Sequence, residues 1–421
     1  QPGWVALVAG LACLLPGIGL VMPREAFDLG KANAILSLAA VLGVATILTR
    51  SGASDLIGAE LSRLAAVEGR SAIYGFIAKG LIERRKAGKP LVIMSLDNVE
   101  RNSSSLKTAM LQFLTQIDAE LAAWTEQNVD FPVTLVDRIT PEVTDKFRHE
   151  TRDALGFRST VVVGTESFRE LVVESVRFPV PAWGACGVKT VEASKSGDHW
   201  KRKFFCLNAG HQVPGIAGVR KGTTFVYEAM AHTSIAALLE RYHAELLSSI
   251  ITEGDAEELA AYCAKIRGRF ADPAMDDTVA RVVARTTSKV SERLLSGLEL
   301  GLQANGKLMT VPTFITAIWL HNLGGENEFG EHITAPDAEA PKLQEVHRDV
   351  MQWVHAHEGD FDCSNCGEAV KGFLIRISEA IRDPRFARLA QNEAFVQLLG
   401  WSLVEIGKLG IEDAIESLLA R

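Results

Sequence analysis

The sequence predicts an α/β domain over residues 1–190, followed by a mostly α-helical domain over residues 191–421. Its 421 residues are about two to three times the usual size of one domain, which favours two domains. In the first part, short apolar runs alternate with amphipathic segments, as strands and helices do in a parallel sheet. In the second part, amphipathic segments of helical length follow one another. We expect the boundary in the Pro- and Gly-rich stretch 179–198.

Composition indicates a packed, soluble protein. The chain is 47% hydrophobic and 23% charged, which is ordinary for globular proteins and excludes a low-complexity fibre. Its 52 acidic residues outnumber its 44 Lys and Arg, so it lacks the basic field that nucleic-acid binding needs. We therefore expect no nucleic-acid partner. Six cysteines, mostly in apolar surroundings, favour a reducing, cytoplasmic setting.

The first half alternates between helical and strand patterns. An amphipathic helix is expected over 73–89, then an apolar strand over 91–96 that ends in Asp97 and Asn98. Polar residues beyond the carboxyl end of a parallel strand lie where open α/β sheets bind ligands, although an Asx turn explains this pair equally well. A further helix and three further strand-like runs are expected over 103–119, 133–136, 159–163 and 168–175.

The first fifty residues contain two uncharged apolar runs, 3–22 and 32–49. Both approach membrane-spanning length, so a transmembrane hairpin is one interpretation. Glycines and a proline interrupt the first run, which favours buried α/β elements, and no basic segment precedes it as in a signal peptide. Gly17 and Gly19 form only a fragment of a dinucleotide-binding turn, because Met22 stands where the third glycine belongs.

The second half reads as a succession of amphipathic helices. These are expected over residues 222–252, 255–270, 275–303, 308–322, 339–357, 367–382 and 385–420.

The segment 203–211 carries the most informative spacing in the chain. On an α-helix Asn208 would lie roughly 140° and His211 roughly 80° round from Lys203, so the three can share a broad face. A lysine against an apolar wall of aromatic residues has a lowered pKa and can act as a general base. An asparagine can donate to an oxygen that gains negative charge, and a histidine can anchor a hydroxyl. The alternative is an ordinary amphipathic helix with a snorkelling lysine.

A second set of candidate ligands lies at 355–366. His355, His357, Cys363 and Cys366 are residue types that bind zinc, but two short pairs need a loop that folds them together. We therefore favour a polar loop between helices over a metal site.

The pattern Lys203-x4-Asn208-x2-His211 resembles the motif of the long-chain polyol dehydrogenases. That family contains mannitol dehydrogenases, mannitol-1-phosphate 5-dehydrogenases and the tagaturonate and fructuronate reductases. Further stretches are similar to the family in the same order, and the resemblance covers roughly residues 70–420. They are residues 80–107, 131–141, 225–235 and 270–295.

The resemblance implies a Rossmann domain followed by a helical domain, NAD or NADP as cofactor, and no catalytic metal. It implies Lys203 as general acid/base, Asn208 as the group that polarises the reacting oxygen, and His211 as a substrate-binding residue. Arg281 and Lys289, spaced eight apart as in the family, would hold hydroxyl or anionic groups of the substrate. The residues alone also fit a salt-bridged helix face, with partners at Asp276, Asp277 and Glu292.

The cofactor candidates are Asp97 and Asn98 beyond the strand, and Gly17 and Gly19 in the glycine fragment. The family's full amino-terminal glycine fingerprint is not found, and Val133 stands where many relatives have a hydrogen-bonding Asn. The expected function is therefore an NAD(P)-dependent oxidoreductase acting on a sugar alcohol or its phosphate. The alternatives are a hexuronate reductase, a non-catalytic relative that has lost cofactor binding, and a membrane-tethered version of the enzyme.

Overall fold

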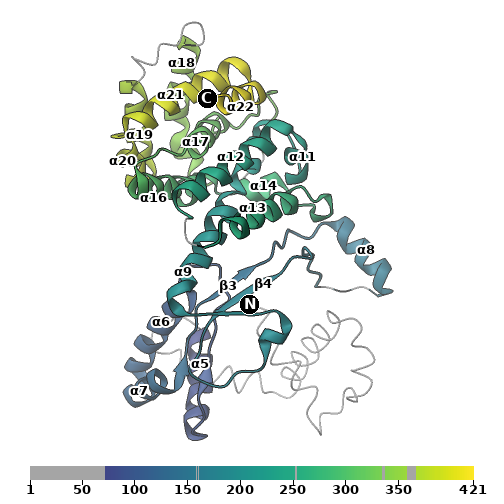
Figure 1. Ribbon diagram of the computed structural model, residues 1–421, viewed down its shortest axis with the longest axis vertical. Coiled ribbons are helices and arrows are strands. Elements are labelled where there is room, and N and C mark those ends of the chain that lie inside the picture. Colours follow the sequence, from purple (N-terminus) through teal and green to yellow (C-terminus); the bar gives the residue numbers. More distant parts are fainter. Residues whose placement is uncertain (1–71, 158, 160, 252–253, 334–336, 358–366) are drawn as a thin grey trace.

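The computed structural model describes residues 72–421 except 158, 160, 252–253, 334–336 and 358–366. Figure 1 shows an amino-terminal part with strands and a helical body that carries the carboxyl terminus. Gly17 and Gly19, the two apolar runs before residue 50, Cys363 and Cys366 lie outside the described residues. Within the described part, no helix is long and apolar enough to cross a membrane.

The amino-terminal part begins with a layer of three helices over a short parallel ladder. The ladder pairs β1 (Leu91–Val92) with β2 (Val129–Asp130). The helices are α5 (Ala72–Lys86), α6 (Asn102–Ile117) and α7 (Ala119–Asn128). Their fully buried faces include Leu81, Met110 and Leu114, and Asp118 caps α7 by accepting from the backbone of Leu121.

A second, mixed sheet carries the chain toward the helical body. β3 (Thr134–Asp137) pairs antiparallel with β4 (Glu170–Glu174), which pairs in parallel with β5 (Lys189–Val191). The expectation of an all-parallel sheet is thus wrong for β3 and β4. The strand expected over 159–163 is also wrong, because its described residues form none and Val161 and Val163 are 50% and 65% exposed. Among the described residues, no strand pairs with this segment.

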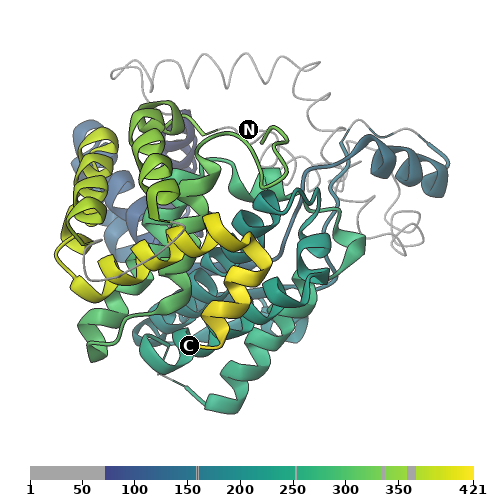
Figure 2. The same ribbon diagram turned by 90° about the horizontal axis from the view of Figure 1, so that it is seen from above.

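One helix of this part stands away from the rest. α8 (Asp145–Leu155) begins at the cap of Thr144 and ends at Gly156, whose φ of 72° places it in the left-handed region. None of its side chains is buried, and Figures 1 and 2 both show it projecting from the molecule.

The carboxyl-terminal body is helical, as expected. Short 3₁₀ turns lie between some of its helices and two π-helical segments, η3 (Lys203–Ala209) and η5 (Val290–Leu295), interrupt the series. The α-helices are α9 (Ala193–Arg202), α10 (Gln212–Arg220), α11 (Val226–Ala231), α12 (Thr233–Ser249), α13 (Ala256–Phe270), α14 (Val279–Val283), α15 (Thr286–Lys289), α16 (Ser296–Asn305), α17 (Thr310–Asn322), α18 (Gln344–His357), α19 (Gly367–Ile381), α20 (Pro384–Leu389), α21 (Glu393–Leu409) and α22 (Ile411–Leu419).

Three of the expected long helices are broken. The helix expected over 222–252 stops at His232, and the one expected over 385–420 is divided by Asn392 and by Gly410 at φ 78°. The helix expected over 275–303 breaks at Arg285, which has a φ of 60°, and then widens into η5. Hydrophobic periodicity continues through such breaks, because the flanking segments still turn apolar faces to one core.

Helix α17 forms the centre of this core. Its side chains from Val311 to His321 are all buried, and α21 packs along it. Buried Gly215 lets α10 approach α14 closely, since a Cβ there would lie 2.5 Å from Cγ1 of Val282. The core therefore fixes α14, whose last turn carries Arg281.

Candidate active site

Lys203 lies at the junction between the two parts of the molecule, as the first residue of π-helix η3. It is only 7% exposed, and its Nζ donates a 2.6 Å hydrogen bond to Oδ1 of Asn98, which follows β1 in the other part. Burial lowers the pKa of Lys203, while the charge of Asp137 opposes that shift. Two of the aromatic residues near Lys203 in the chain, Trp200 and Phe204, stack with their ring centres 4.4 Å apart.

The π-helical turn changes the expected geometry around Lys203. In η3 the amide of Gly210 bonds to the carbonyl of Phe205, five residues earlier, so the turn is wider than in an α-helix. Tyr242 donates to the Phe205 carbonyl at 3.1 Å, and a ring nitrogen of His243 lies 3.0 Å from the Cys206 carbonyl. Side chains of α12 thus support the backbone of the widened turn.

Asn208 and His211 lie further along the same segment and contact other partners. Asn208 is half-buried, and its backbone carbonyl accepts a 3.1 Å hydrogen bond from Arg293. His211 Nε2 lies 3.3 Å from Oδ2 of Asp277, and its ring stacks on Phe270 at 4.2 Å. Burial lowers the pKa of His211, and the hydrogen bond to Asp277 opposes that shift.

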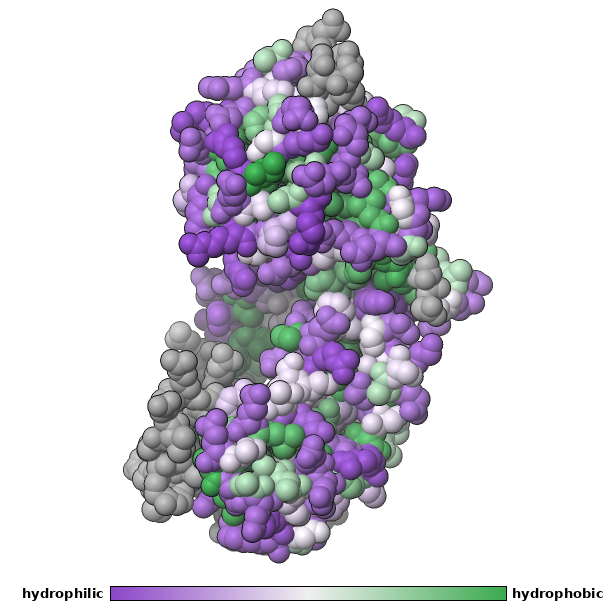
Figure 3. Space-filling model, turned by 90° about the vertical axis from the view of Figure 1, so that its left-hand side faces the viewer, coloured by the Kyte–Doolittle hydropathy of each residue, from purple (hydrophilic) through white to green (hydrophobic). Residues whose placement is uncertain are grey.

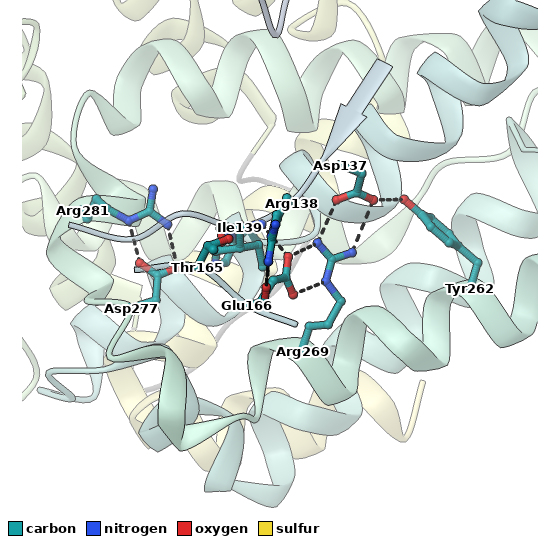
Figure 4. A network of polar contacts seen from close by, with 10 residues as sticks. Asp137, Arg138, Ile139, Thr165, Glu166, Tyr262, Arg269, Asp277 and Arg281 are labelled. Carbon is teal, nitrogen blue, oxygen red and sulfur yellow. Dashed lines mark hydrogen bonds and ion pairs between the residues drawn. The ribbon is translucent and has the colours of Figure 1, made fainter. Parts of the chain in front are cut away.

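Asp277 also binds Arg281. Nε and Nη2 of Arg281 each donate at 2.6 Å to the two carboxylate oxygens, a bidentate pair that Figure 4 shows. Burial alone would raise the pKa of Asp277, but the hydrogen bonds from His211 and Arg281 hold that pKa at about 2. Arg281 is thus paired with one of the carboxylates that the salt-bridge interpretation named.

Lys289, the second expected substrate-binding residue, donates to backbone oxygen instead. Its Nζ bonds to the carbonyl of Val282 at 2.6 Å. Burial, together with the charges of Arg293, Arg281 and Arg285, lowers the pKa of Lys289 to about 8. A lysine with this pKa exchanges its proton near neutral pH.

The two candidate cofactor residues after β1 have different contacts. Asn98 is exposed and contacts Lys203, whereas Asp97 is held in its loop by Ser95 and Asn102. The structure therefore places Asn98 at the lysine and brings Asp97 to no other candidate residue.

A buried polar network that the sequence reasoning missed lies beside Lys203. Asp137, at the end of β3, is fully buried; it accepts from Arg269 at 2.7 Å and from the Tyr262 hydroxyl at 2.9 Å. Arg269 also binds Glu166 at 2.7 Å, so one guanidinium joins two carboxylates (Figure 4). Because Arg269 and Tyr262 belong to α13, the network links the helical body to the strands. Asp137 follows a predicted apolar strand directly, the same signal that selected Asn98.

Of the four candidate metal ligands, the structure describes His355 and His357. His357 lies at the end of α18 with Nδ1 2.7 Å from the carbonyl of Trp353. Among the described residues no group of three or more His, Cys, Asp or Glu is placed to hold a metal ion. Figure 3 shows the surface hollowed between the helical body and the amino-terminal part.

Comparison with known proteins identifies the family of this chain. Residues 30–184 match the mannitol dehydrogenase Rossmann domain, and residues 198–358 match the mannitol dehydrogenase C-terminal domain. The chain belongs to the mannitol dehydrogenase family of long-chain polyol dehydrogenases. The expected order of a Rossmann-like domain and a helical domain is thereby confirmed, whereas the boundary at residue 190 stays a prediction.

The chain spans about half the length of the curated relatives that it matches. The chain is 28% identical over 296 residues to a mannitol 2-dehydrogenase of Phaeosphaeria nodorum, covering 69% of this chain and 50% of that protein. It is 29% identical over 275 residues to mannitol dehydrogenase 2 of Saccharomyces cerevisiae, covering 65% and 54%.

Solved structures show the same fold. The Pseudomonas fluorescens mannitol 2-dehydrogenase, a ternary complex with NAD and D-mannitol, matches with a TM-score of 0.64 at 24% identity, covering 87% of this chain and 69% of that one. A substrate-free D-sorbitol dehydrogenase matches with a TM-score of 0.66 at 24% identity, covering 85% and 69%.

Proposed function

We propose that this chain is an NAD(P)-dependent polyol dehydrogenase that interconverts a secondary alcohol of a sugar alcohol with the ketone of a keto-sugar. The observation that carries the proposal is Lys203, a buried amine with a lowered pKa that meets Asn98 across the junction of the two parts. The relatives that are named mannitol dehydrogenases support this substrate class. The NAD and D-mannitol bound to the Pseudomonas fluorescens protein support the cofactor.

Lys203 is suited to move the proton of the reacting hydroxyl. In its neutral form it accepts that proton during alcohol oxidation, and in its charged form it returns the proton during ketone reduction. Asn98 already accepts from Nζ through Oδ1, so its Nδ2 is the group that donates to the substrate oxygen. This assigns Asn98 to the reacting oxygen, a different role from the cofactor contact expected from the sequence.

Other side chains keep the lysine and the substrate in place. Asn208 follows Lys203 by one π-helical turn, where its amide would polarise the same oxygen. Asp277 holds His211 and Arg281 together, so the groups that it leaves unused, Nδ1 of His211 and Nη1 of Arg281, would form one fixed unit for substrate hydroxyls. The reaction needs no metal ion at these residues, because Lys203 itself carries the proton.

The dinucleotide would lie along the carboxyl edge of β1 and β2. These strands are parallel, and the exposed Asp97 and Asn98 follow β1 at the edge where open α/β sheets bind nucleotides. When bound, the nicotinamide supplies or accepts the hydride. The cofactor is NAD or NADP. A cytoplasmic location and the absence of a nucleic-acid partner remain predictions.

The test compares Lys203→Met with Lys201→Met, a matched control at an exposed lysine two residues earlier. Binding of NADH and NADPH is measured by nicotinamide fluorescence, and reduction of fructose, fructose 6-phosphate and tagaturonate is then followed in the same samples. We expect Lys203→Met to lower kcat by about 10²–10⁴-fold while cofactor affinity is kept. We expect Lys201→Met to behave like the wild type.

Two results would contradict the proposal. Turnover by Lys203→Met at the wild-type rate would exclude Lys203 as the acid/base. A folded wild-type protein that binds neither cofactor would instead support the non-catalytic relative.

A further inference from the structure

The wide turn of η3 diverts both amides that would usually bond to the carbonyl of Cys206. In an α-helix that carbonyl accepts from the amide of Gly210, and in a continuous π-helix it accepts from the amide of His211. Here the Gly210 amide bonds to the carbonyl of Phe205 at 3.1 Å, and the His211 amide bonds to that of Leu207 at 2.9 Å. Cys206 is fully buried, so bulk solvent does not replace these donors.

A buried histidine of α12 supplies a donor to this carbonyl. Nε2 of His243 lies 3.0 Å from the Cys206 carbonyl oxygen, and His243 is only 1% exposed. Because a carbonyl can only accept, Nε2 carries the proton and donates. The contact is tightly enclosed, since a Cβ on Gly210 would overlap the Cys206 oxygen and lie 3.2 Å from Nε2 of His243.

A neighbour on α13 agrees with this assignment of the ring proton. Nη1 of Arg267 lies 3.4 Å from Nδ1 of His243. A guanidinium has only donors, so Nδ1 is the unprotonated nitrogen of the ring. Burial lowers the pKa of His243 to about 4, so the ring is uncharged at neutral pH. His243 therefore presents one fixed donor to the wide turn.

The Cys206 carbonyl and the candidate acid/base belong to the same turn. Cys206 follows Lys203 by three residues in η3, and Nζ of Lys203 meets Asn98 at 2.6 Å. A buried carbonyl left without a donor costs free energy. Without His243 the backbone would regain a donor by shifting the wide turn along the segment, so that the Gly210 amide returns to Cys206. That shift would move Lys203 relative to Asn98.

We propose that His243 is a positioning residue for the acid/base. Its hydrogen bond to the Cys206 carbonyl fixes the wide turn in the register that places Nζ of Lys203 at Asn98. His243 acts through the backbone of η3 and not by contact with the substrate. This inference rests on the proposed function for the role of Lys203, and it goes beyond that function by assigning a residue of another helix to the same site.

The experiment compares variants that remove the donor with variants that keep it. His243→Leu removes the donor and leaves an apolar side chain in the core. His243→Gln keeps a donor, because the amide nitrogen of Gln takes a place close to that of Nε2. His243→Asn has a shorter side chain that does not reach the carbonyl, and it replaces His243→Leu if that variant does not fold.

His321 provides the matched control. It is also buried, at 5% exposed, and its Nε2 lies 2.9 Å from the carbonyl of Leu403. This contact joins α17 to α21, two helices that carry none of the candidate site residues. His321→Leu therefore removes the same kind of buried hydrogen bond at a distance from η3.

The first readout separates kcat from binding of the reduced cofactor. We expect His243→Leu to lower kcat for ketone reduction about 10–100-fold with little change in cofactor affinity, since misplacing a reacting group acts on the chemical step. His243→Gln should recover most of kcat. His321→Leu should lose as much stability in urea as His243→Leu and still keep the wild-type kcat.

A second readout needs no turnover. The pH dependence of reductive methylation at Lys203, followed by mass spectrometry, reports the pKa of its amine. The wild type, His243→Gln and His321→Leu should share the lowered pKa, whereas His243→Leu should raise it toward the usual 10.5 because the amine leaves its buried place.

The two readouts distinguish failure of the inference from failure of the proposed function. If no ketose is reduced but the methylation of Lys203 behaves as expected, the proposed function fails and the positioning of the lysine stands. The inference is overturned if His243→Leu resembles His321→Leu in both kcat and methylation, or if His243→Gln is as impaired as His243→Leu.

Discussion

Removing Arg269 should cost the protein far more stability than removing an ordinary surface arginine. Its guanidinium binds buried Asp137 and Glu166, each at 2.7 Å, and lies 4.2 Å from the ring centre of Phe168. The side chains of the three charged residues are 8%, 0% and 4% exposed. In Arg269→Met two neighbouring carboxylates stay buried without their cation. Breaking a buried pair in this way costs about 3–5 kcal/mol of unfolding free energy.

Arg267 provides the matched control on the same helix. It pairs with Glu240 at 3.4 Å, where the two side chains are 26% and 68% exposed, and its Nη1 lies 3.4 Å from Nδ1 of His243. Loss of such an exposed pair costs at most about 1 kcal/mol. Urea unfolding of Arg269→Met and Arg267→Met at pH 7 measures the two losses directly.

A double variant tests whether the uncompensated carboxylates cause the loss. Adding Asp137→Asn to Arg269→Met removes one buried negative charge, so the double variant should be more stable than Arg269→Met alone. The reasoning is refuted if Arg269→Met and Arg267→Met lose the same stability, or if Asp137→Asn makes the Arg269→Met protein still less stable.

Three further predictions concern protonation and packing. Because the pKa of Lys203 lies below the usual lysine value of 10.5, kcat/KM for polyol oxidation should rise with pH and level off before that value, whereas ketone reduction falls; a pH-independent profile would contradict this. The pKa of Lys289 falls from 10.5 to about 8, so the folded state holds that proton less tightly than the unfolded state and stability should rise between those pH values. Lys289→Met should remove about 1–2 kcal/mol of this rise after allowance for solvent screening, as measured by urea unfolding at pH 7 and pH 10. Gly215→Ala should destabilise the protein by about 1–3 kcal/mol through its contact with Val282, whereas Gly268→Ala, with nothing within 4 Å, should stabilise it by about 0.5–1 kcal/mol; similar melting temperatures for the two variants would contradict the packing argument.

The order of domains could be predicted from the sequence because it depends on local periodicity. Amphipathic repeats of helical length mark the second domain, and alternating apolar runs mark the first. Where elements end was harder to predict. The break at Arg285 depends on a left-handed backbone that a non-glycine residue adopts only in its tertiary surroundings. Likewise, the run at 159–163 is apolar but exposed, and only the fold decides whether a strand lies beside it.

The candidate residues that lie in one motif could be named from the sequence. Lys203, Asn208 and His211 lie close in the chain, so their spacing alone made them candidates. Asn98 bonds to Lys203 from 105 residues away, and Arg269 reaches Asp137 across 132 residues. No local pattern reports such contacts.

The π-helical segment at Lys203–Ala209 makes chain length part of the geometry of the proposed active site. Deletion of a single residue here would remove the extra residue that the wide turn accommodates, close the turn to α-helix and change the direction in which its own side chains point, Lys203 among them. The amine of Lys203 would then leave Asn98 even though every other side chain were retained. A chimaera that joins a foreign amino-terminal domain to this helical body must therefore preserve the number of residues from α9 through η3. In a mutant library, substitutions in this segment should keep the position of Lys203 more often than insertions or deletions do.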